Sequence, residues 1–333
     1  MKDVTNYSLK AHNTFGIDAS CSRFLEFNSV EEAKNVATII RESGLPYLII
    51  GGGSNLLLTR DFDGIVVRSA LRLVLFDDDR LQCGSGVEWD ELVDHCINKG
   101  YYGLENLSLI PGDVGASAVQ NIGAYGVEAK DFIEKVWAVE IATGELRVFN
   151  NEDCQYAYRW SRFKGEWKDK YLITQVDFKL SPQFVPRLEY GNISSELLRR
   201  NISSPDARQV RNVIIDLRNQ KLPDPKLMGN AGSFFVNPIV TRSKYEQMSA
   251  EYIGMPHYYI NEEQEKIPAA WLIEQCGWKG RTLGRAGVHD RQALVLVNKG
   301  GANGEDILNL CKAIQQDVSQ KFGITLKPEV NIV

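Results

Sequence analysis

The segment IPGDVGASAVQNIGAYG, residues 110–126, has the composition of a ligand-binding loop. It holds four glycines, three alanines and a single charged residue, Asp113. Such small residues let a ligand lie directly on the backbone, whose N–H groups then donate hydrogen bonds. A second neutral loop, GGGSN at 51–55, follows the apolar run YLII. Either loop alone could equally be a tight turn beside a packed core, but the pair indicates a large anionic cofactor held mainly by main-chain amides.

Ser233 is a candidate proton donor in the segment GNAGSFFVNP, residues 229–238. It follows Gly232 at the expected entry to a strand, where a ligand lying on the glycines can reach its hydroxyl. The Gly-x-Ser-x-Gly elbow of hydrolases is excluded, because Phe235 stands where the second glycine is needed. Histidine bases are scarce, so the hydroxyl is expected to donate a proton rather than to attack. A turn hydroxyl without chemical function is the alternative interpretation.

Three charged residues are further candidates. Arg159 lies among aromatic residues in YAYRWS, where it either meets an anion or stacks on Trp160 at the surface. Glu329 precedes the apolar C-terminal residues in LKPEV, and Lys221 precedes a proline-rich stretch. A rim-exposed acid and a solvated lysine are the simpler explanations for these two. None of the four candidates is decisive by itself.

Composition excludes several classes of function. The chain has 333 residues, 44% hydrophobic and 24% charged, and its net charge of −5 argues against a nucleic-acid partner. No apolar stretch approaches the roughly 18 residues of a membrane span. Six cysteines without a CxxC spacing indicate buried, reduced thiols and a cytoplasmic location. Four histidines without ligand spacing predict no metal site, and a monomer is the default expectation.

The N-terminal pattern predicts a strand at 23–27 and a helix from the N-cap Ser29, with Glu32 in a capping box, to Gly44. Strands at 47–50 and 64–68 then flank the GGGSN loop. In a Rossmann unit or a Walker A site the glycine loop opens a helix, whereas here a strand follows. Gly-Lys-Ser/Thr is also absent. Both common nucleotide-binding motifs are therefore disfavoured.

The remaining pattern is mixed. We expect a helix at 89–99, a hairpin of 133–141 and 145–149, a strand at 171–180, and a helix from Pro205 to about residue 219. Prolines 223 and 225 end that helix and mark a domain boundary. The last third predicts strands at 232–237, 293–298 and 329–333, with helices at 241–252, 268–276 and 304–322.

Seven motifs occur in an order that resembles one family over nearly the whole chain. They are NTFGI (13–17), GGGSNLLL (51–58), GLENLSLIPGDVGASAVQNIGAYGVE (103–128), YRWS (158–161), KLPDPK (221–226), GNAGSFFVNP (229–238) and LKPEV (326–330). Together they resemble the UDP-N-acetylenolpyruvoylglucosamine reductases, flavoenzymes that form UDP-N-acetylmuramate for bacterial peptidoglycan. Tyr190 and Tyr258 match the substrate loops of the longer of the family's two types.

The resemblance implies an α+β fold: a two-part FAD-binding module of the PCMH/vanillyl-alcohol-oxidase type plus a C-terminal α/β substrate-binding domain. The implied parts are FAD-binding subdomains at 1–68 and 69–219, and a substrate-binding domain at 220–333 whose segment 326–333 returns to the active site. FAD is expected to bind non-covalently and NADPH to supply hydride. Hydride then passes from the flavin N5 to the enolpyruvyl methylene carbon, while Ser233 protonates the adjacent carbon.

The resemblance also assigns residues. The catalytic positions fall on Arg159, Ser233 and Glu329, and burial is expected to raise the pKa of Glu329. Ala116 departs from relatives with serine or glycine there, which moves one flavin contact to Ser117 or removes it. The expected substrate contacts are Tyr158, Tyr190, Lys221, Asn237, Tyr258 and Gln292. The expected FAD contacts are Gly51, Gly52, Gly53, Ser54, Asn55, Ile110, Pro111, Gly112, Gly115, Ser117, Gln120, Asn121, Ile122, Gly123, Tyr125 and Gly126.

Two other functions remain as alternatives. A flavin oxidase of the same fold often tethers its flavin through histidine, and no histidine adjoins the GGGSN loop. A catalytically silent nucleotide-sugar-binding protein should have lost a catalytic residue, and Arg159, Ser233 and Glu329 are all present. Small-molecule substrates are the only partners that the sequence implies.

Overall fold

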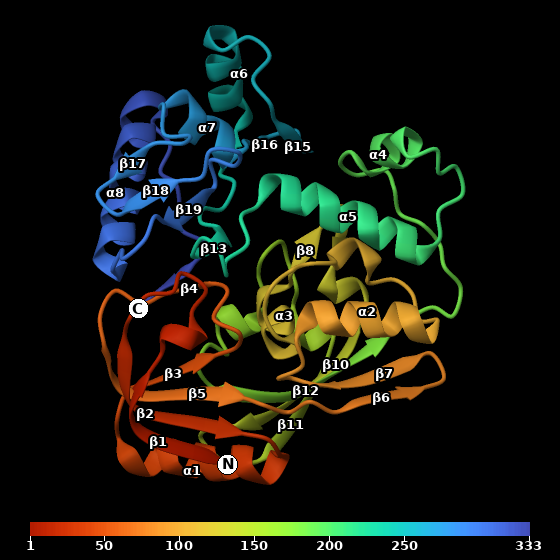
Figure 1. Cartoon of the computed structure of the whole chain (residues 1–333), viewed down its shortest axis with the longest axis vertical. Coiled ribbons are helices and arrows are strands. Elements are labelled where there is room, and N and C mark those ends of the chain that lie inside the picture. The colour runs from red at the N-terminus through yellow and green to blue at the C-terminus, as the bar shows by residue number, and fades with distance from the viewer. The chain divides into compact units, whose positions relative to one another are not determined.

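A computed structural model describes all 333 residues, which form two compact units (Figure 1). Unit 1 comprises residues 1–7, 21–53 and 62–218, and unit 2 comprises 8–20, 54–61 and 219–333. Two short N-terminal segments therefore belong with the C-terminal third. None of the helices combines the length and apolar character needed to cross a membrane. No cysteine is in a disulfide, and all but the partly exposed Cys276 are buried.

Unit 1 contains two main sheets. Apolar and polar residues alternate along strands with one buried face, and strands buried on both faces are apolar throughout. The first has the order β1-β2-β5-β3, with β2 and β3 parallel to β5. The second is antiparallel and has the order β11-β10-β12-β7-β6. The strands are β1 (Lys2–Ser8), β2 (Ser20–Phe27), β3 (Tyr47–Ile50), β5 (Phe62–Ser69), β6 (Val74–Asp77), β7 (Arg80–Gly84), β10 (Ile133–Glu140), β11 (Leu146–Asn150) and β12 (Tyr171–Lys179).

Helices cover these sheets through apolar faces. Buried residues of α1 (Val30–Ser43) pack with those of β2, β5 and β10. α2 (Trp89–Lys99) and α3 (Val114–Gln120) share one core with β7, β10 and β12. α4 (Ile193–Arg199) and α5 (Ala207–Lys221) contribute a separate cluster. Short 3-10 turns occupy Glu105–Leu107, Ala129–Asp131, Glu152–Cys154 and Arg162–Lys164.

Most predicted elements of unit 1 are confirmed, and three details are wrong. Ser29 caps α1 as expected, but Glu32 accepts from the Asn28 N–H at 2.8 Å, so the capping box is not reciprocal. Pro205 does not start α5, because Asp206 and Gln209 exchange side-chain-to-backbone bonds and the helix begins at Ala207. The segment 110–126 is not all loop: it contains α3 and β8 (Gly123–Ala124), and β8 forms a small hairpin with β9 (Val127–Glu128) just beyond the segment.

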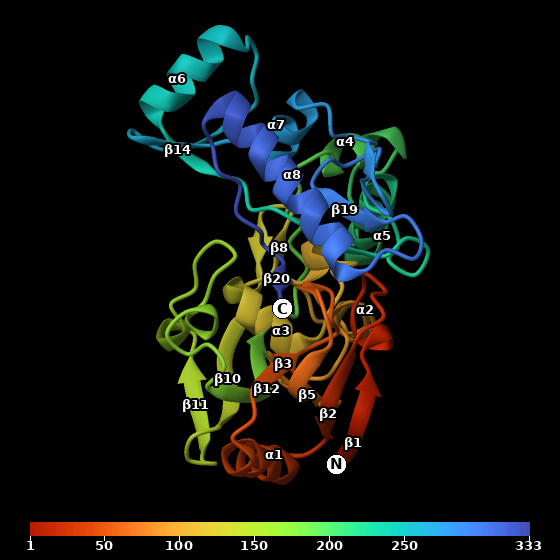
Figure 2. The same ribbon diagram turned by 90° about the vertical axis from the view of Figure 1, so that its left-hand side faces the viewer.

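Unit 2 is built on an antiparallel sheet of order β13-β19-β18-β17. Its long helix α8 (Gly304–Phe322) packs against β18 and β19, and Figure 2 shows α8 beside β19. The strands are β13 (Asn230–Ser233), β17 (Thr282–Leu283), β18 (Ala286–Val288) and β19 (Val295–Asn298). β13 begins two residues before the predicted strand at 232–237 and ends four residues before it, at Ser233, where the chain leaves the sheet.

A smaller sheet and two short helices complete this unit. The sheet has the order β14-β16-β15, from β14 (Ile239–Thr241), β16 (Gln264–Lys266) and β15 (Tyr258–Asn261). The helices α6 (Arg242–Glu251), α7 (Ala269–Gln275) and α8 confirm the predicted ones within one or two residues. β20 (Asn331–Ile332) pairs in parallel with β4 (Leu56–Leu57), which lies in the N-terminal segment 54–61 of unit 2. The other N-terminal segment of this unit, 8–20, contains the 3-10 turn Lys10–His12.

Candidate active site

The two glycine-rich loops meet within unit 1. A Cβ added to Gly52 would lie 3.2 Å from the Cα of Gly112, and one added to Gly51 would lie 3.1 Å from the Cβ of Ala116. Only glycine at 51 and 52 therefore allows this close approach without displacing a neighbour. The turn interpretation and the ligand interpretation are thus compatible, because the two loops pack tightly on each other through glycine and alanine.

Asp113 and Arg68 form an incompletely satisfied polar pair beside these loops. Asp113 is only 6% exposed, and its Oδ2 lies 3.6 Å from an Arg68 Nη2, too far for a good hydrogen bond. Asp113 Oδ2 and Arg68 Nε are both buried without a hydrogen-bond partner. Burial raises the pKa of Asp113 to about 6, although Arg68 acts in the opposite direction. An orphaned donor next to neutral, glycine-lined loops fits an anionic cofactor such as FAD.

Four residues of the candidate site adopt left-handed backbone conformations that are uncommon outside glycine. They are Leu109, Asn121, Tyr125 and Arg159, with φ values of 58°, 45°, 49° and 54°. Such conformations cost about 1 kcal/mol or more each in a bulky residue and concentrate at functional sites. The surrounding contacts must hold these residues in place.

Arg159 is directed at the small-residue segment 110–126, which is the predicted flavin loop. Its Nη2 donates to the Gly123 carbonyl at 2.6 Å, and its guanidinium carbon lies 5.3 Å from the centre of the Tyr158 ring. Asn121 ties the same two segments together by donating to the Ala157 carbonyl at 2.8 Å. The structure therefore brings the arginine of YRWS against the hairpin end of the small-residue segment.

Tyr190 also approaches this segment. A Cβ on Gly126 would lie 3.2 Å from the Cβ of Tyr190, and one on Gly191 would lie 3.2 Å from the Tyr125 ring. The pairs Tyr125-Gly126 and Tyr190-Gly191 thus interlock, each glycine making room for the other pair's tyrosine. Unit 1 consequently presents Tyr158 and Tyr190, which are 44% and 51% exposed, on segments that contact the predicted flavin loop.

Arg218, on α5, is a residue that the sequence interpretation missed. Its Nε is buried without a hydrogen-bond partner. Burial lowers the pKa of its guanidinium; the nearby Arg159 adds to the effect, and Tyr125 and Asp90 oppose it. A second guanidinium thus faces the same surroundings as Arg159. Spacing gave only a partial signal: Arg218 stands seven residues after Arg211, which is the one charged residue among the buried residues of α5.

The remaining flavin-loop candidates are mostly fixed by backbone and side-chain contacts. Gly115 packs on Ser85, whose carbonyl accepts its N–H at 2.9 Å. Ser117 is buried and donates its hydroxyl to the Val114 carbonyl at 2.7 Å, so this proton is used within α3. Gln120 accepts from Lys164 at 2.9 Å. Ile110 and Ile122 are partly exposed and Pro111 is exposed along the same segment.

Unit 2 places Ser233 and Glu329 on adjoining segments. After β13 ends at Ser233, the Phe234 carbonyl accepts the Glu329 N–H at 2.8 Å, and the next residues pair with Pro328 and Lys327. Ser233 is exposed and Glu329 partly buried. A neutral hydroxyl donor and a carboxyl group, 96 positions apart in sequence, are therefore carried by paired extended backbone.

Asn55, from the GGGSN loop, belongs to the same cluster. Its side chain donates to the Glu329 carbonyl at 3.2 Å, and its own carbonyl accepts the Asn331 N–H at 3.1 Å. The pairing of β4 with β20 continues this contact. Of the flavin-loop candidates, Asn55 and its neighbour Ser54 thus belong to unit 2, while Gly51, Gly52 and Gly53 belong to unit 1.

The predicted substrate residues of unit 2 are dispersed over four elements. Lys221 is exposed at the end of α5, and Tyr258 is 45% exposed at the start of β15. The Asn237 carboxamide oxygen accepts the Ala269 N–H at 2.9 Å and so fixes the start of α7. The Gln292 carboxamide oxygen accepts from Leu294 in the turn before β19.

Comparison with known proteins identifies two domains in this chain. Residues 22–150 match the model of an FAD-binding domain, and residues 224–333 match the C-terminal domain of UDP-N-acetylenolpyruvoylglucosamine reductase. A UDP-N-acetylenolpyruvoylglucosamine reductase of Bacteroides fragilis is 51% identical over 98% of this chain and 99% of its own. The chain belongs to the UDP-N-acetylenolpyruvoylglucosamine reductase family.

Further comparisons agree with this family. The reductase of Flavobacterium johnsoniae is 45% identical over the full length of both chains. The solved structure of the Thermus caldophilus reductase has a TM-score of 0.68 and 24% identity, covering 99% of this chain and 98% of its own. A 6-hydroxy-D-nicotine oxidase of Arthrobacter nicotinovorans shares the fold more distantly, with a TM-score of 0.53 and 14% identity over 92% of this chain and 81% of its own. The predicted α+β fold with an FAD-binding module is confirmed, and the chain is an FAD-dependent oxidoreductase of peptidoglycan precursor synthesis.

Proposed function

We propose that the protein uses NADPH to reduce UDP-N-acetylglucosamine enolpyruvate to UDP-N-acetylmuramate, with Ser233 as proton donor. The observation that carries this proposal is the backbone pairing of Phe234 with Glu329, which presents a hydroxyl and a carboxyl group from adjoining segments. FAD, when bound, supplies hydride transfer from NADPH to the terminal methylene carbon of the enolpyruvyl ether. The chain's own residues then have to hold the cofactor and substrate, stabilise charge and deliver a proton.

The residues proposed to hold FAD are the two glycine-rich loops. Gly51 and Gly52 pack closely on the segment from Gly112 to Ala116, and the Nε of Arg68 is a buried donor without a partner. These groups suit the pyrophosphate of a dinucleotide. No covalent attachment is proposed.

Ser233 is proposed to protonate the carbon next to the one that receives hydride. A serine hydroxyl is a very weak acid, but an enolate-like carbon is a strong base, so a neutral donor is sufficient. The exposed position of Ser233 after Gly232, whose φ of 68° turns the chain, makes its hydroxyl accessible to substrate.

Arg159 is proposed to stabilise the negative charge that develops on the substrate carboxylate. A planar guanidinium can donate to both oxygens of such a group. The bond to the Gly123 carbonyl and the contact with Tyr158 hold the side chain before substrate arrives, which lowers the cost of reorganisation.

Glu329 is proposed to act either in its protonated form or by orienting Arg159. An unaltered pH–rate profile and full activity in a Glu329→Gln enzyme would contradict both roles. Tyr190 and Tyr258 are proposed to cap the substrate as in the longer type of the family, and Lys221 to bind a phosphate. Tyr158, Asn237 and Gln292 complete the proposed substrate contacts.

The same proposal includes the domain organisation, the oligomeric state and the location of the protein. Residues 1–68 and 69–219 form two FAD-binding subdomains, and 220–333 form the substrate-binding domain. The segment 326–333 returns to the active site, and the protein acts as a monomer in the cytoplasm.

The test separates the two half-reactions. The visible flavin band is followed anaerobically, first on addition of NADPH and then on addition of the enolpyruvyl sugar nucleotide. We expect bleaching and then recovery in the wild type, whereas Ser233→Ala should bleach normally and recover at least a hundredfold more slowly. Ser249→Ala, which removes an exposed hydroxyl in α6, is the matched control.

Other outcomes would redirect the proposal. Equal loss of both half-reactions in Ser233→Ala would remove its role as proton donor. A wild-type flavin that bleaches but does not recover would require a different acceptor, as a flavin oxidase would have. Absence of a flavin band after incubation with FAD would favour a silent nucleotide-sugar-binding protein.

A further inference from the structure

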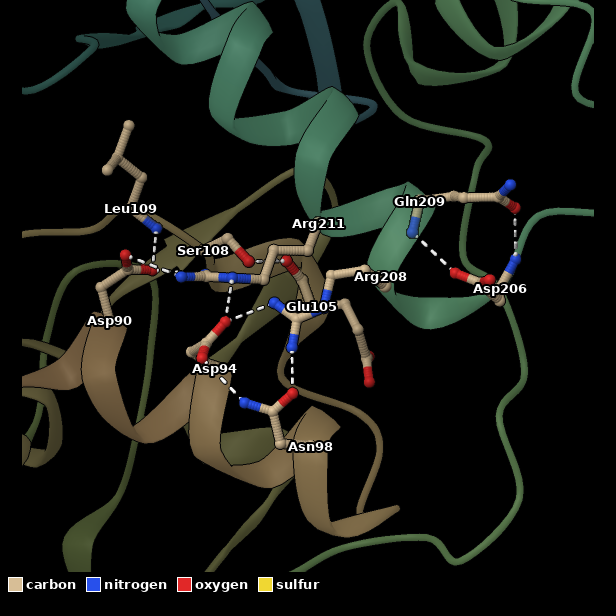
Figure 3. A network of polar contacts seen from close by, with 10 residues as sticks. All are labelled: Asp90, Asp94, Asn98, Glu105, Ser108, Leu109, Asp206, Arg208, Gln209 and Arg211. Atoms are coloured by element: carbon tan, nitrogen blue, oxygen red, sulfur yellow. Dashed lines mark hydrogen bonds and ion pairs between the residues drawn. The ribbon is translucent and has the colours of Figure 1, made fainter.

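A partly buried ion pair joins the predicted flavin loop to helix α5. The Asp90 carboxylate, in the first turn of α2, accepts the Leu109 N–H at 2.5 Å through Oδ1. The same carboxylate accepts two bonds from Arg211 of α5, at 2.6 Å and 3.0 Å. Figure 3 shows Asp90 between these two partners. One side chain thus contacts the backbone of the loop and the guanidinium of the helix simultaneously.

Both ends of this link lead into the candidate active site. Leu109 directly precedes Ile110-Pro111-Gly112, and its φ of 58° is a strained conformation that the charged acceptor helps to maintain. On the other side, Arg211 is seven residues before Arg218, which places the two arginines on one helix face. The helix ends at Lys221, three residues further on.

Arg211 is well suited to fix the helix. Its side chain is only 7% exposed, and its planar fork binds the Asp90 carboxylate bidentately. Its Nε also lies 3.3 Å from Asp94, one turn along α2. A paired, bidentate contact of this kind resists sliding of α5 along α2 more strongly than apolar packing, which tolerates small shifts.

A second contact between the same helices provides an internal control. Arg208, one turn before Arg211, binds Asp94 and also donates to Asn98 at 2.6 Å. Its polar contacts are with Asp94 and Asn98, and not with Asp90 or Leu109. In Figure 3 it lies on the side of Asp94 toward Asn98. Arg208 therefore joins α2 to α5 without reaching the flavin loop.

We propose that Asp90 and Arg211 are positioning residues for the active site. Their ion pair holds the predicted flavin loop at Leu109, and it fixes helix α5, which carries Arg218 and Lys221. Only the part of this inference that concerns substrate binding rests on the proposed function. Asp90 acts on cofactor binding through the loop, whereas Arg211 acts on substrate binding through the helix. The two residues should therefore have different effects when they are replaced.

The experiment compares Asp90→Asn, Arg211→Met and Arg208→Met. FAD affinity is measured by fluorescence titration of the flavin-free protein, and KM and kcat for the enolpyruvyl sugar are measured at saturating FAD. We expect Asp90→Asn to weaken FAD binding about tenfold and raise KM about tenfold, because it weakens both links. Arg211→Met should raise KM similarly, with FAD affinity changed less than threefold. Arg208→Met should change neither quantity by more than twofold.

This pattern distinguishes positioning from general stability. Unchanged FAD affinity in Asp90→Asn, or unchanged KM in Arg211→Met, would overturn the proposal. Equal effects of Arg208→Met and Arg211→Met would overturn it too, since any contact between the helices would then suffice. If a variant does not fold, Asp90→Glu or Arg211→Lys replaces it. Both keep the charge but alter the bidentate geometry, so each should shift the same quantities in the same direction by a smaller factor. The FAD titration uses no substrate, so it decides the loop half even if the proposed reaction is wrong.

Discussion

The buried carboxyl of Asp113 gives a stability prediction whose size follows from the structure. Replacing it by asparagine keeps the shape and removes the titration. Burial raises the pKa of Asp113 to about 6, against an ordinary value of 3.8. At 1.36 kcal/mol for each pKa unit, the difference corresponds to about 3 kcal/mol of folding free energy.

The sign follows from proton binding. The unfolded chain loses this proton near pH 4, whereas the folded chain keeps it to about pH 6. Between these values the folded state holds more protons, so the free energy of unfolding falls as pH rises. Asp113→Asn has no proton to lose. Relative to the wild type it should therefore gain about 3 kcal/mol between about pH 4 and about pH 7.

The assay is urea unfolding of the flavin-free protein at several pH values across this window. The quantity of interest is the variant's free energy of unfolding minus that of the wild type, because other titrations cancel in the difference. Asp63→Asn, which removes an exposed carboxylate in β5, should give a flat difference and serves as control. A flat difference for Asp113→Asn would refute the buried-acid reasoning. A fall with pH would show that attraction to Arg68 outweighs burial.

Two glycines give further predictions. Gly52→Ala places a Cβ 3.2 Å from the Cα of Gly112, so the predicted flavin loops must separate slightly. Fluorescence titration should show that FAD binding is weakened about tenfold. An unchanged affinity would mean that the loops can move apart at no cost. Gly304→Ala places a Cβ against the Leu58 carbonyl oxygen at the first turn of α8, too close for a real contact. Urea unfolding should show that the free energy of unfolding falls by about 3 kcal/mol. A fall of less than about 1 kcal/mol would contradict this close contact.

Local sequence rules predicted the elements with strong end signals. α8 begins after Asn303, whose side chain exchanges capping bonds with Asp306, and ends at Gly323 in a left-handed conformation. Both signals lie within the helix and its flanks, so no tertiary information was needed. α3 was missed because glycine and alanine give no apolar period, and its helical turn depends on packing against β7, β10 and β12.

Contacts distant in sequence were not predictable from local pattern. The motifs selected Ser233 and Glu329 as candidates, but their adjacency depends on pairing between the segments around 234–236 and 327–329. The assignment of 8–20 and 54–61 to the C-terminal unit has the same origin. Arg218 was missed because its significance comes from an unpartnered buried nitrogen near Arg159, which spacing alone does not reveal.

The parallel pairing of β4 with β20 has a consequence for how the protein is made. Leu56, Leu57 and Leu58 are buried in the folded chain, yet the Asn331–Ile332 strand that pairs with β4 is made more than 270 residues later. At roughly 5–20 residues per second, a ribosome leaves these leucines without their final neighbours for on the order of tens of seconds. Such an apolar stretch is a natural target for chaperones that shield nascent chains. A stalled ribosome would release an intermediate whose unit 2 is open at this point, exposed to proteolysis and aggregation.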